Sequence, residues 1–236
     1  MKLINAFLQL IRWPNLVFIA VTQILFNYTV VLPLFHQAGL APNLLNKNFI
    51  LLCIASLLIA GAGYIINDYF DVNIDQINKP KKVVIDKTIN RRWAIFWHLL
   101  MSITGIILSY TISFHMGDKY LLIGNVNLVC VIILWLYSTT YKKKILVGNI
   151  IISLLTAWTI LVIYIAQIPF WWQSFNQYAQ PLTKLFRVAI LYAGFAFIIS
   201  LIREVVKDIE DIDGDRKEGC RTMPITWGIP ASKIFC

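Results

Sequence analysis

Residues 49–75 read FILLCIASLLIAGAGYIINDYFDVNID, an apolar run that passes directly into a cluster of aspartates. The apolar part, residues 49–66, contains no charged side chain. A run of this length approaches the ~20 residues that a helix needs to cross the hydrocarbon core of a bilayer. The stretch therefore predicts a transmembrane helix whose end carries a group of carboxylates.

The composition of the whole chain agrees with a membrane location. Of its 236 residues 58% are hydrophobic and only 14% are charged, and the mean hydropathy is +0.70. Soluble globular proteins are about a quarter charged. These values exclude an ordinary soluble enzyme, a disordered chain and a small disulfide-stapled domain.

Six apolar segments are long enough to span a membrane. Each is predicted to be helical, because lipid offers no partner to an unpaired backbone group and no segment shows the alternation of a barrel strand. The predicted fold is an all-α, polytopic transmembrane helix bundle, with residues 1–236 forming one transmembrane domain. The expected spans are Leu16 to Phe35, Phe49 to Ile66, Trp93 to Phe114, Tyr120 to Thr140, Leu146 to Phe170 and Leu185 to Ile202.

Basic residues are divided unequally between the two sides that these spans define. One side, made of the N-terminus and residues 67–92, 141–145 and 203–236, holds 17 of the 21 Lys and Arg residues. By the positive-inside rule that side is cytoplasmic in a multi-pass protein of the cell (inner) membrane. The net charge of +9 thus reflects membrane topology and contact with membrane lipids, and no nucleic-acid partner is expected.

Acidic residues follow the same division, which the rule does not require: 11 of the 12 lie on the cytoplasmic side. Two clusters share one spacing, with aspartates at i, i+3 and i+7: Asp68, Asp71, Asp75 and Asp208, Asp211, Asp215. On a helix these offsets share a face, and oxygen ligands without nearby His or Cys select a hard cation such as Mg²⁺. The alternative is that both are solvated acids paired with lysines. Glu204, Glu210 and Asp213 fall on other faces and are expected to be solvated.

Four segments together resemble one known family. The run NDYFDVNID at residues 67–75 and the run DIEDIDGD at residues 208–215 resemble the two aspartate motifs of the UbiA family of intramembrane prenyltransferases. Arg12-Trp13-Pro14-Asn15 resembles the family's entry segment. Tyr137-Ser138, followed by Lys142 and Gly148-Asn149, resembles the segment after its fourth span.

The resemblance implies a Mg²⁺-dependent enzyme that transfers a prenyl group from an isoprenyl diphosphate. It implies metal ligands at Asn67, Asp68, Asp71, Asp75, Asp208, Asp211 and Asp215, with Asp71, Asp75, Asp211 and Asp215 as catalytic carboxylates. The substrate-binding residues that it implies are Arg12, Asn15, Tyr137, Ser138, Lys142 and Lys207.

The acceptor and the activity remain open at this point. Residues 207–215 resemble the branch of the family that geranylgeranylates geranylgeranylglyceryl phosphate, and an aromatic acceptor, as in quinone synthesis, is the alternative. Family members have nine transmembrane helices, so the expectation is a domain that lacks the last three, and an inactive remnant is a further alternative. A transporter or ion-binding protein is disfavoured, because its carboxylates would be expected at mid-span.

Overall fold

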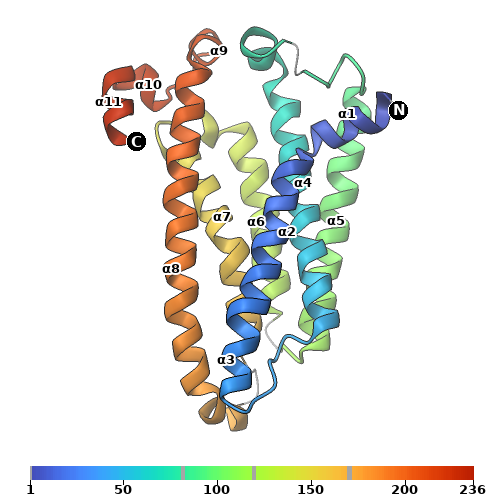
Figure 1. Cartoon of the computed structure of the whole chain (residues 1–236). Helices are drawn as coiled ribbons and strands as arrows, with labels where there is room; N and C mark the ends of the chain where they lie inside the picture. Colours follow the sequence, from blue (N-terminus) through green and yellow to red (C-terminus); the bar gives the residue numbers. More distant parts are fainter. Residues whose placement is uncertain (1, 81–82, 119–120, 169–171) are drawn as a thin grey trace.

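The computed structural model describes residues 2–80, 83–118, 121–168 and 172–236. They form an all-helical bundle (Figure 1), and no β-strand occurs within these ranges. The predicted all-α fold is confirmed, and six helical segments are long and apolar enough to cross a membrane. The expected span ends at Tyr120 and Phe170 lie outside the described residues. The helices are α1 (Lys2–Leu10), α2 (Trp13–Phe26), the π-helix η1 (Asn27–Val31), α3 (Leu32–Gln37), α4 (Asn46–Asn78), α5 (Arg91–His115), α6 (Leu122–Thr139), the 3₁₀ turn η2 (Tyr141–Lys143), α7 (Val147–Ala166), α8 (Trp172–Glu210), α9 (Ile212–Lys217), α10 (Met223–Thr226) and α11 (Ile229–Phe235).

Local sequence explains where several helices begin, end or change pitch. Pro80 follows the end of α4, where Lys79 leaves the helical region, because a residue before proline disfavours helical backbone. Asn90 caps α5 by accepting a hydrogen bond from the Arg92 backbone at 3.0 Å. Pro33 lacks an N–H and its ring would meet the carbonyl four residues earlier, and the wider turn of η1 immediately before it relieves that conflict.

The predicted first span is therefore one continuous helical segment, Trp13–Gln37, that contains a π-helical turn. The second span continues as α4 through the whole first aspartate cluster to Asn78. Both ends of this chain, the end of α4 and the short helix α9 lie at the same end of the bundle (Figure 1). This arrangement brings the two acidic clusters to one end.

Two hydrophobic clusters hold the bundle together. One lies away from the acidic end and joins residues of α2, α3, α4, α7 and α8, among them Phe26, Phe35 and Leu185. The other joins α1, α4, α5 and the segment at residues 84–89, with Leu10, Ile65 and Ile85 fully or almost fully buried. This second hydrophobic cluster packs against α4 next to its acidic end and holds that end in place.

Polar side chains also connect helices inside the apolar part. Gln23 of α2 donates to the Ser56 hydroxyl at 3.0 Å and to the Thr159 carbonyl at 2.9 Å. Asn127 of α6 donates to Ser109 at 2.8 Å and accepts from the Trp158 indole at 2.9 Å. Such bonds hold membrane helices in register, because the hydrophobic effect between helices is weak in lipid.

Candidate functional site

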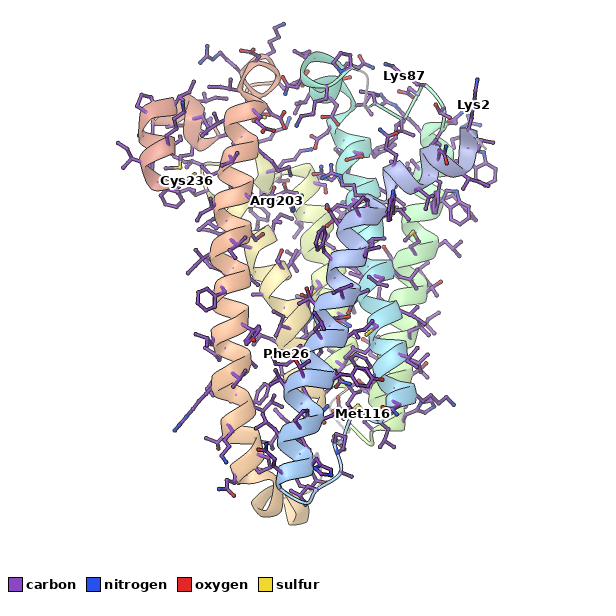
Figure 2. The ribbon with its side chains drawn as sticks, viewed as in Figure 1. Lys2, Phe26, Lys87, Met116, Arg203 and Cys236 are labelled. Atoms are coloured by element: carbon purple, nitrogen blue, oxygen red, sulfur yellow. The ribbon has the colours of Figure 1, made fainter. Side chains whose placement is uncertain are left out.

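A polar cavity of about 320 Å³ opens at the end of the bundle where the two clusters meet. Figure 2 shows oxygen- and nitrogen-tipped side chains gathered at this end, toward which Arg203 and Lys87 lie, while Met116 lies toward the opposite end. The cavity draws residues from α1, α4, α6, α7, α8, α9 and the intervening turns. Its charged and amide lining consists of Gln9, Arg12, Asn67, Asp68, Asp71, Asp75, Lys79, Lys142, Asn149, Glu204, Lys207, Asp208, Asp211 and Asp215.

The first cluster is held by cations from two other parts of the chain. Arg12 Nη2 lies 2.6 Å from Asp68 Oδ1, and Lys142 Nζ forms an ion pair with Asp71 Oδ1. Asn67 Nδ2 donates to the other oxygen of Asp71 at 2.8 Å. Two of the three cations that the resemblance implied, Arg12 and Lys142, therefore pair with aspartates of the first cluster.

Backbone geometry aims both cations. Arg12 adopts a left-handed conformation (φ 50°) at the corner between α1 and α2, and its guanidinium also stacks over the Tyr64 ring, 5.2 Å from the centroid. Gly148 allows the turn that carries Lys142 to pack against α7, because a Cβ at that position would lie 2.8 Å from Lys142 Cα. A side chain at residue 148 would push Lys142 away from Asp71.

The second cluster is held in the same manner. Lys79 Nζ lies 2.7 Å from Asp211 Oδ1, and Asn149 Nδ2 donates to Asp208 Oδ2 at 2.8 Å. Within the described residues the carboxylates of Asp75 and Asp215, which line the cavity, form no side-chain hydrogen bond or ion pair. Burial, together with the negative charges of Asp208 and Asp211, raises the pKa of Asp215 to about 7. The cluster therefore resists full ionisation unless further positive charge is bound.

The geometry of the second cluster differs from the predicted single helical face. Helix α8 ends at Glu210 and α9 begins at Ile212, so that Asp211 stands at a one-residue break. Asp208, Asp211 and Asp215 all line the cavity nevertheless. In the first cluster, a helix rises roughly 10 Å between residues seven apart, which separates Asp68 from Asp75 along the cavity.

The prediction that Glu204 is solvated is wrong. Glu204 is only 7% exposed, lines the cavity and accepts a hydrogen bond from Lys207 Nζ at 2.9 Å. Helix α8 packs against α7 along this stretch, which turns residue 204 inward. Lys207 thus reaches the cavity as predicted, already paired with a carboxylate.

Two of the predicted substrate-binding residues do not line this cavity. Ser138 is buried and donates its hydroxyl to the Leu134 carbonyl of its own helix at 2.9 Å, while its neighbour Tyr137 does face the cavity. Asn15 hydrogen-bonds the Tyr64 side chain and lines a neighbouring groove, which shares Gln9 and Arg12 with the cavity. Asn15 therefore helps to hold Tyr64, over whose ring the Arg12 guanidinium stacks.

The sequence analysis assigned no site role to three residues that the structure brings to the clusters. Lys79 and Asn149 bond carboxylates of the second cluster, and Asn78 bonds the backbone of that segment at Asp211 and Gly214. The sequence carried one signal, since Asn149 belongs to the Gly-Asn pair of the resemblance. Nothing in the spacing pointed to Asn78.

Comparison with known proteins places this geometry in a family. The sequence profile of the UbiA prenyltransferase family matches residues 24–236. The chain belongs to the UbiA prenyltransferase family. Together with the six apolar helices, UbiA membership makes it an integral membrane protein.

The similar UbiA proteins include several archaeal enzymes. The chain is 31% identical to the digeranylgeranylglyceryl phosphate synthase of Methanosphaera stadtmanae over 183 residues, which cover 78% of this chain and 59% of that protein. It is 30% identical to the synthase of the same name from Methanothermobacter thermautotrophicus over 231 residues, which cover 98% of this chain and 70% of that protein. The chain thus spans about three fifths to seven tenths of the length of these two relatives.

A solved structure shares the UbiA fold. It is described as concerning digeranylgeranylglyceryl phosphate synthase in membranes, superposes with a TM-score of 0.63 and 24% identity, and covers all of this chain and 74% of its own. At this identity the likeness concerns the fold alone. The helix arrangement that positions the cavity is therefore one already observed in a membrane protein.

UbiA prenyltransferases generally depend on a divalent metal, and the residues present fit one. The buried Oδ1 of Asn67 has no hydrogen-bond partner among the described residues, and the donors are all hard oxygens. No three of the described His, Cys, Asp and Glu side chains converge on one point. A Mg²⁺ ion usually takes only one or two carboxylates and completes its shell with water and substrate phosphate oxygens. Carboxylates that are spread along the cavity in this way therefore fit such an ion.

Proposed function

We propose that this chain transfers a geranylgeranyl group from geranylgeranyl diphosphate to geranylgeranylglyceryl phosphate in a Mg²⁺-dependent reaction. The observation that carries the proposal is the cavity in which two aspartate clusters, contributed by α4 and by α8 with α9, face each other around Arg12, Lys79 and Lys142. The names of the curated relatives support the lipid acceptor. Residues 1–236 are proposed to belong to a single transmembrane prenyltransferase domain.

The charges of the cavity suit a diphosphate. The first cluster, Asn67, Asp68, Asp71 and Asp75, would share the binding of one Mg²⁺, and the second, Asp208, Asp211 and Asp215, that of another. One or two carboxylates of each cluster would bind the ion directly, and water or phosphate oxygens would complete its shell. When bound, Mg²⁺ supplies Lewis-acid neutralisation of the leaving diphosphate. Arg12, Lys142 and Lys207 would neutralise remaining phosphate oxygens, since all three side chains line the cavity. Tyr137 would contact a phosphate or the acceptor.

Ionisation of an allylic diphosphate leaves a carbocation that water must not reach before the acceptor oxygen does. The cavity lies at the end of an apolar bundle, so that a long isoprenyl chain can extend away from the charged end into lipid-like surroundings. The acceptor hydroxyl loses its proton as the new carbon–oxygen bond forms. Asp75 and Asp215 are carboxylates at the cavity that can accept it.

The charged end is proposed to face the cytoplasm, so that the water-soluble head group of an isoprenyl diphosphate can enter the cavity from that side. This orientation is supported by the 17 of 21 basic residues on that side, because the positive-inside rule places the basic side in the cytoplasm.

A competition assay tests the proposal. Membranes containing the full chain are offered labelled geranylgeranyl diphosphate together with geranylgeranylglyceryl phosphate or 4-hydroxybenzoate, with and without Mg²⁺. We expect Mg²⁺-dependent label in the ether-lipid product. Label only in the aromatic product would refute the lipid acceptor while leaving the prenyltransferase intact, and label in neither product would refute the activity.

A further inference from the structure

Asn78, the last residue of α4, connects the two acidic clusters through the backbone. Its Nδ2 donates to the Asp211 carbonyl at 2.9 Å, and its Oδ1 accepts from the Gly214 N–H at 2.8 Å. One amide side chain therefore joins the residue at the break, Asp211, to the third residue of α9, both more than 130 residues away in sequence.

These bonds replace an ordinary helix cap. Asp211 is the N-cap residue of α9 and Gly214 is its third helical residue. An aspartate at an N-cap normally accepts a hydrogen bond from the N–H of the second or third helical residue. Asp211 makes no such bond, and its carboxylate instead turns to the cavity and pairs with Lys79 at 2.7 Å.

We infer that Asn78 is a positioning residue that caps α9 from another helix and thereby frees the Asp211 carboxylate to face the cavity. The inference rests on the proposed metal-dependent function, in which Asp211 is a ligand. Without Asn78, the Gly214 N–H loses the side-chain partner it has here, and the N-cap side chain, which belongs to Asp211, is the group that ordinarily accepts from that position. The carboxylate then leaves the cavity.

Gly214 is the second half of this connection. A Cβ at residue 214 would lie 2.5 Å from Asn78 Nδ2 and 2.8 Å from Oδ1, closer than atoms can approach. Only glycine lets the Asn78 amide reach the backbone at this point. Substituting Gly214 displaces the amide without altering any carboxylate.

The test measures binding of Mn²⁺, as a spectroscopic substitute for Mg²⁺, to the purified full chain by electron paramagnetic resonance. Asn78→Ala is expected to weaken Mn²⁺ binding by about 10- to 100-fold, the range for residues that orient metal ligands. Turnover of Asn78→Ala should recover at saturating Mg²⁺, because the ligands themselves remain. A merely structural defect would not be rescued by metal.

Gly214→Ala should weaken Mn²⁺ binding to a similar extent, and the double variant with Asn78→Ala should be no worse than either single one, since both break the same connection. Asn90→Ala is the matched control, because it removes an asparagine cap from α5 outside the cavity. It should lower the melting temperature and leave Mn²⁺ affinity unchanged.

The outcomes separate this inference from the proposed function. Equal Mn²⁺ affinity of wild type and Asn78→Ala would overturn the role of Asn78 alone. Additive losses in the double variant would also overturn it. Absence of Mn²⁺ binding by the wild-type chain would overturn the proposed function and this inference with it.

Discussion

Lys142 differs from its two lysine neighbours in what its ammonium group meets. Its side chain is only 10% exposed and pairs with Asp71, which is 15% exposed, whereas Lys143 and Lys144 are exposed. Three consecutive lysines after a span can each serve topology. The structure distinguishes them by contact, which their order in the chain does not reveal.

We predict that Lys142→Met raises the KM for the isoprenyl diphosphate by at least about tenfold, because losing one partner of a desolvated charge pair costs about 2–5 kcal/mol. Lys144→Met is the matched control and should change KM little. Steady-state kinetics with the labelled diphosphate measure both. Equal effects of the two substitutions would assign Lys142 to topology.

A second prediction at this scale concerns the carboxylates. Asp71→Asn and Asp211→Asn should each abolish the difference in isoprenyl diphosphate binding between Mg²⁺ and EDTA, because an uncompensated diphosphate charge is costly in a site shielded from water. Asp213→Asn, which changes an exposed neighbour, should retain that difference. Binding that is the same in Mg²⁺ and EDTA for the wild type would contradict the metal site altogether.

Much of the candidate site could be predicted from the sequence, because chemistry at fixed spacing is visible there. Asp68, Asp71 and Asp75 share a helical face on periodicity alone. The inward turn of Glu204 and the partner of Asp211 could not be predicted, because both depend on which helix packs alongside. Asn78 bonds backbone atoms of a distant segment. Every residue has such atoms, so the side chains of that segment do not reveal the contact in the sequence.

At the scale of the elements, the contact between α4 and α5 depends on small residues. A Cβ at Gly105 of α5 would lie 2.8 Å from the Ile59 side chain and 3.3 Å from the Ala55 carbonyl of α4. Small residues let membrane helices approach closely. This contact holds α4, the helix that contains the first acidic cluster, against α5.

We therefore predict that Gly105→Val lowers stability by about 1–3 kcal/mol, the usual cost of overpacking. Gly194→Val provides the comparison, because a Cβ at Gly194 of α8 meets nothing within 4 Å among the described residues. Thermal unfolding in detergent, followed by loss of monodisperse protein, measures both. A smaller loss for Gly105→Val than for Gly194→Val would contradict the close packing.

The elements themselves divide into predictable and unpredictable features. Six apolar runs of sufficient length make six helices, because lipid permits no other backbone. The break at Asp211 and the π turn at residues 27–31 were not predicted. The first is stabilised by bonds from Asn78 and the second by how Pro33 is accommodated, and neither follows from hydropathy.

At the scale of the whole molecule, the bundle has one charged end. In a cysteine-free background, Gln37→Cys at the end of α3 and Asn73→Cys on α4 place exposed thiols at opposite ends. An impermeant maleimide added to intact cells should label residue 37, and residue 73 should react only after permeabilisation. Labelling of residue 73 in intact cells would reverse the orientation.

The ion pairs that line the cavity join residues far apart in the chain, so they form only after both partners have been synthesised. The partner of Asp71 is a lysine 71 residues later in the chain, and the partner of Lys79 is an aspartate 132 residues later. A nascent chain that has inserted only its first two spans therefore presents unpaired acids and bases at the membrane surface. The cavity forms late in translation, when α8 and α9 arrive, and a ribosome-bound chain ending before residue 208 has no second cluster with which to bind a bridging ligand.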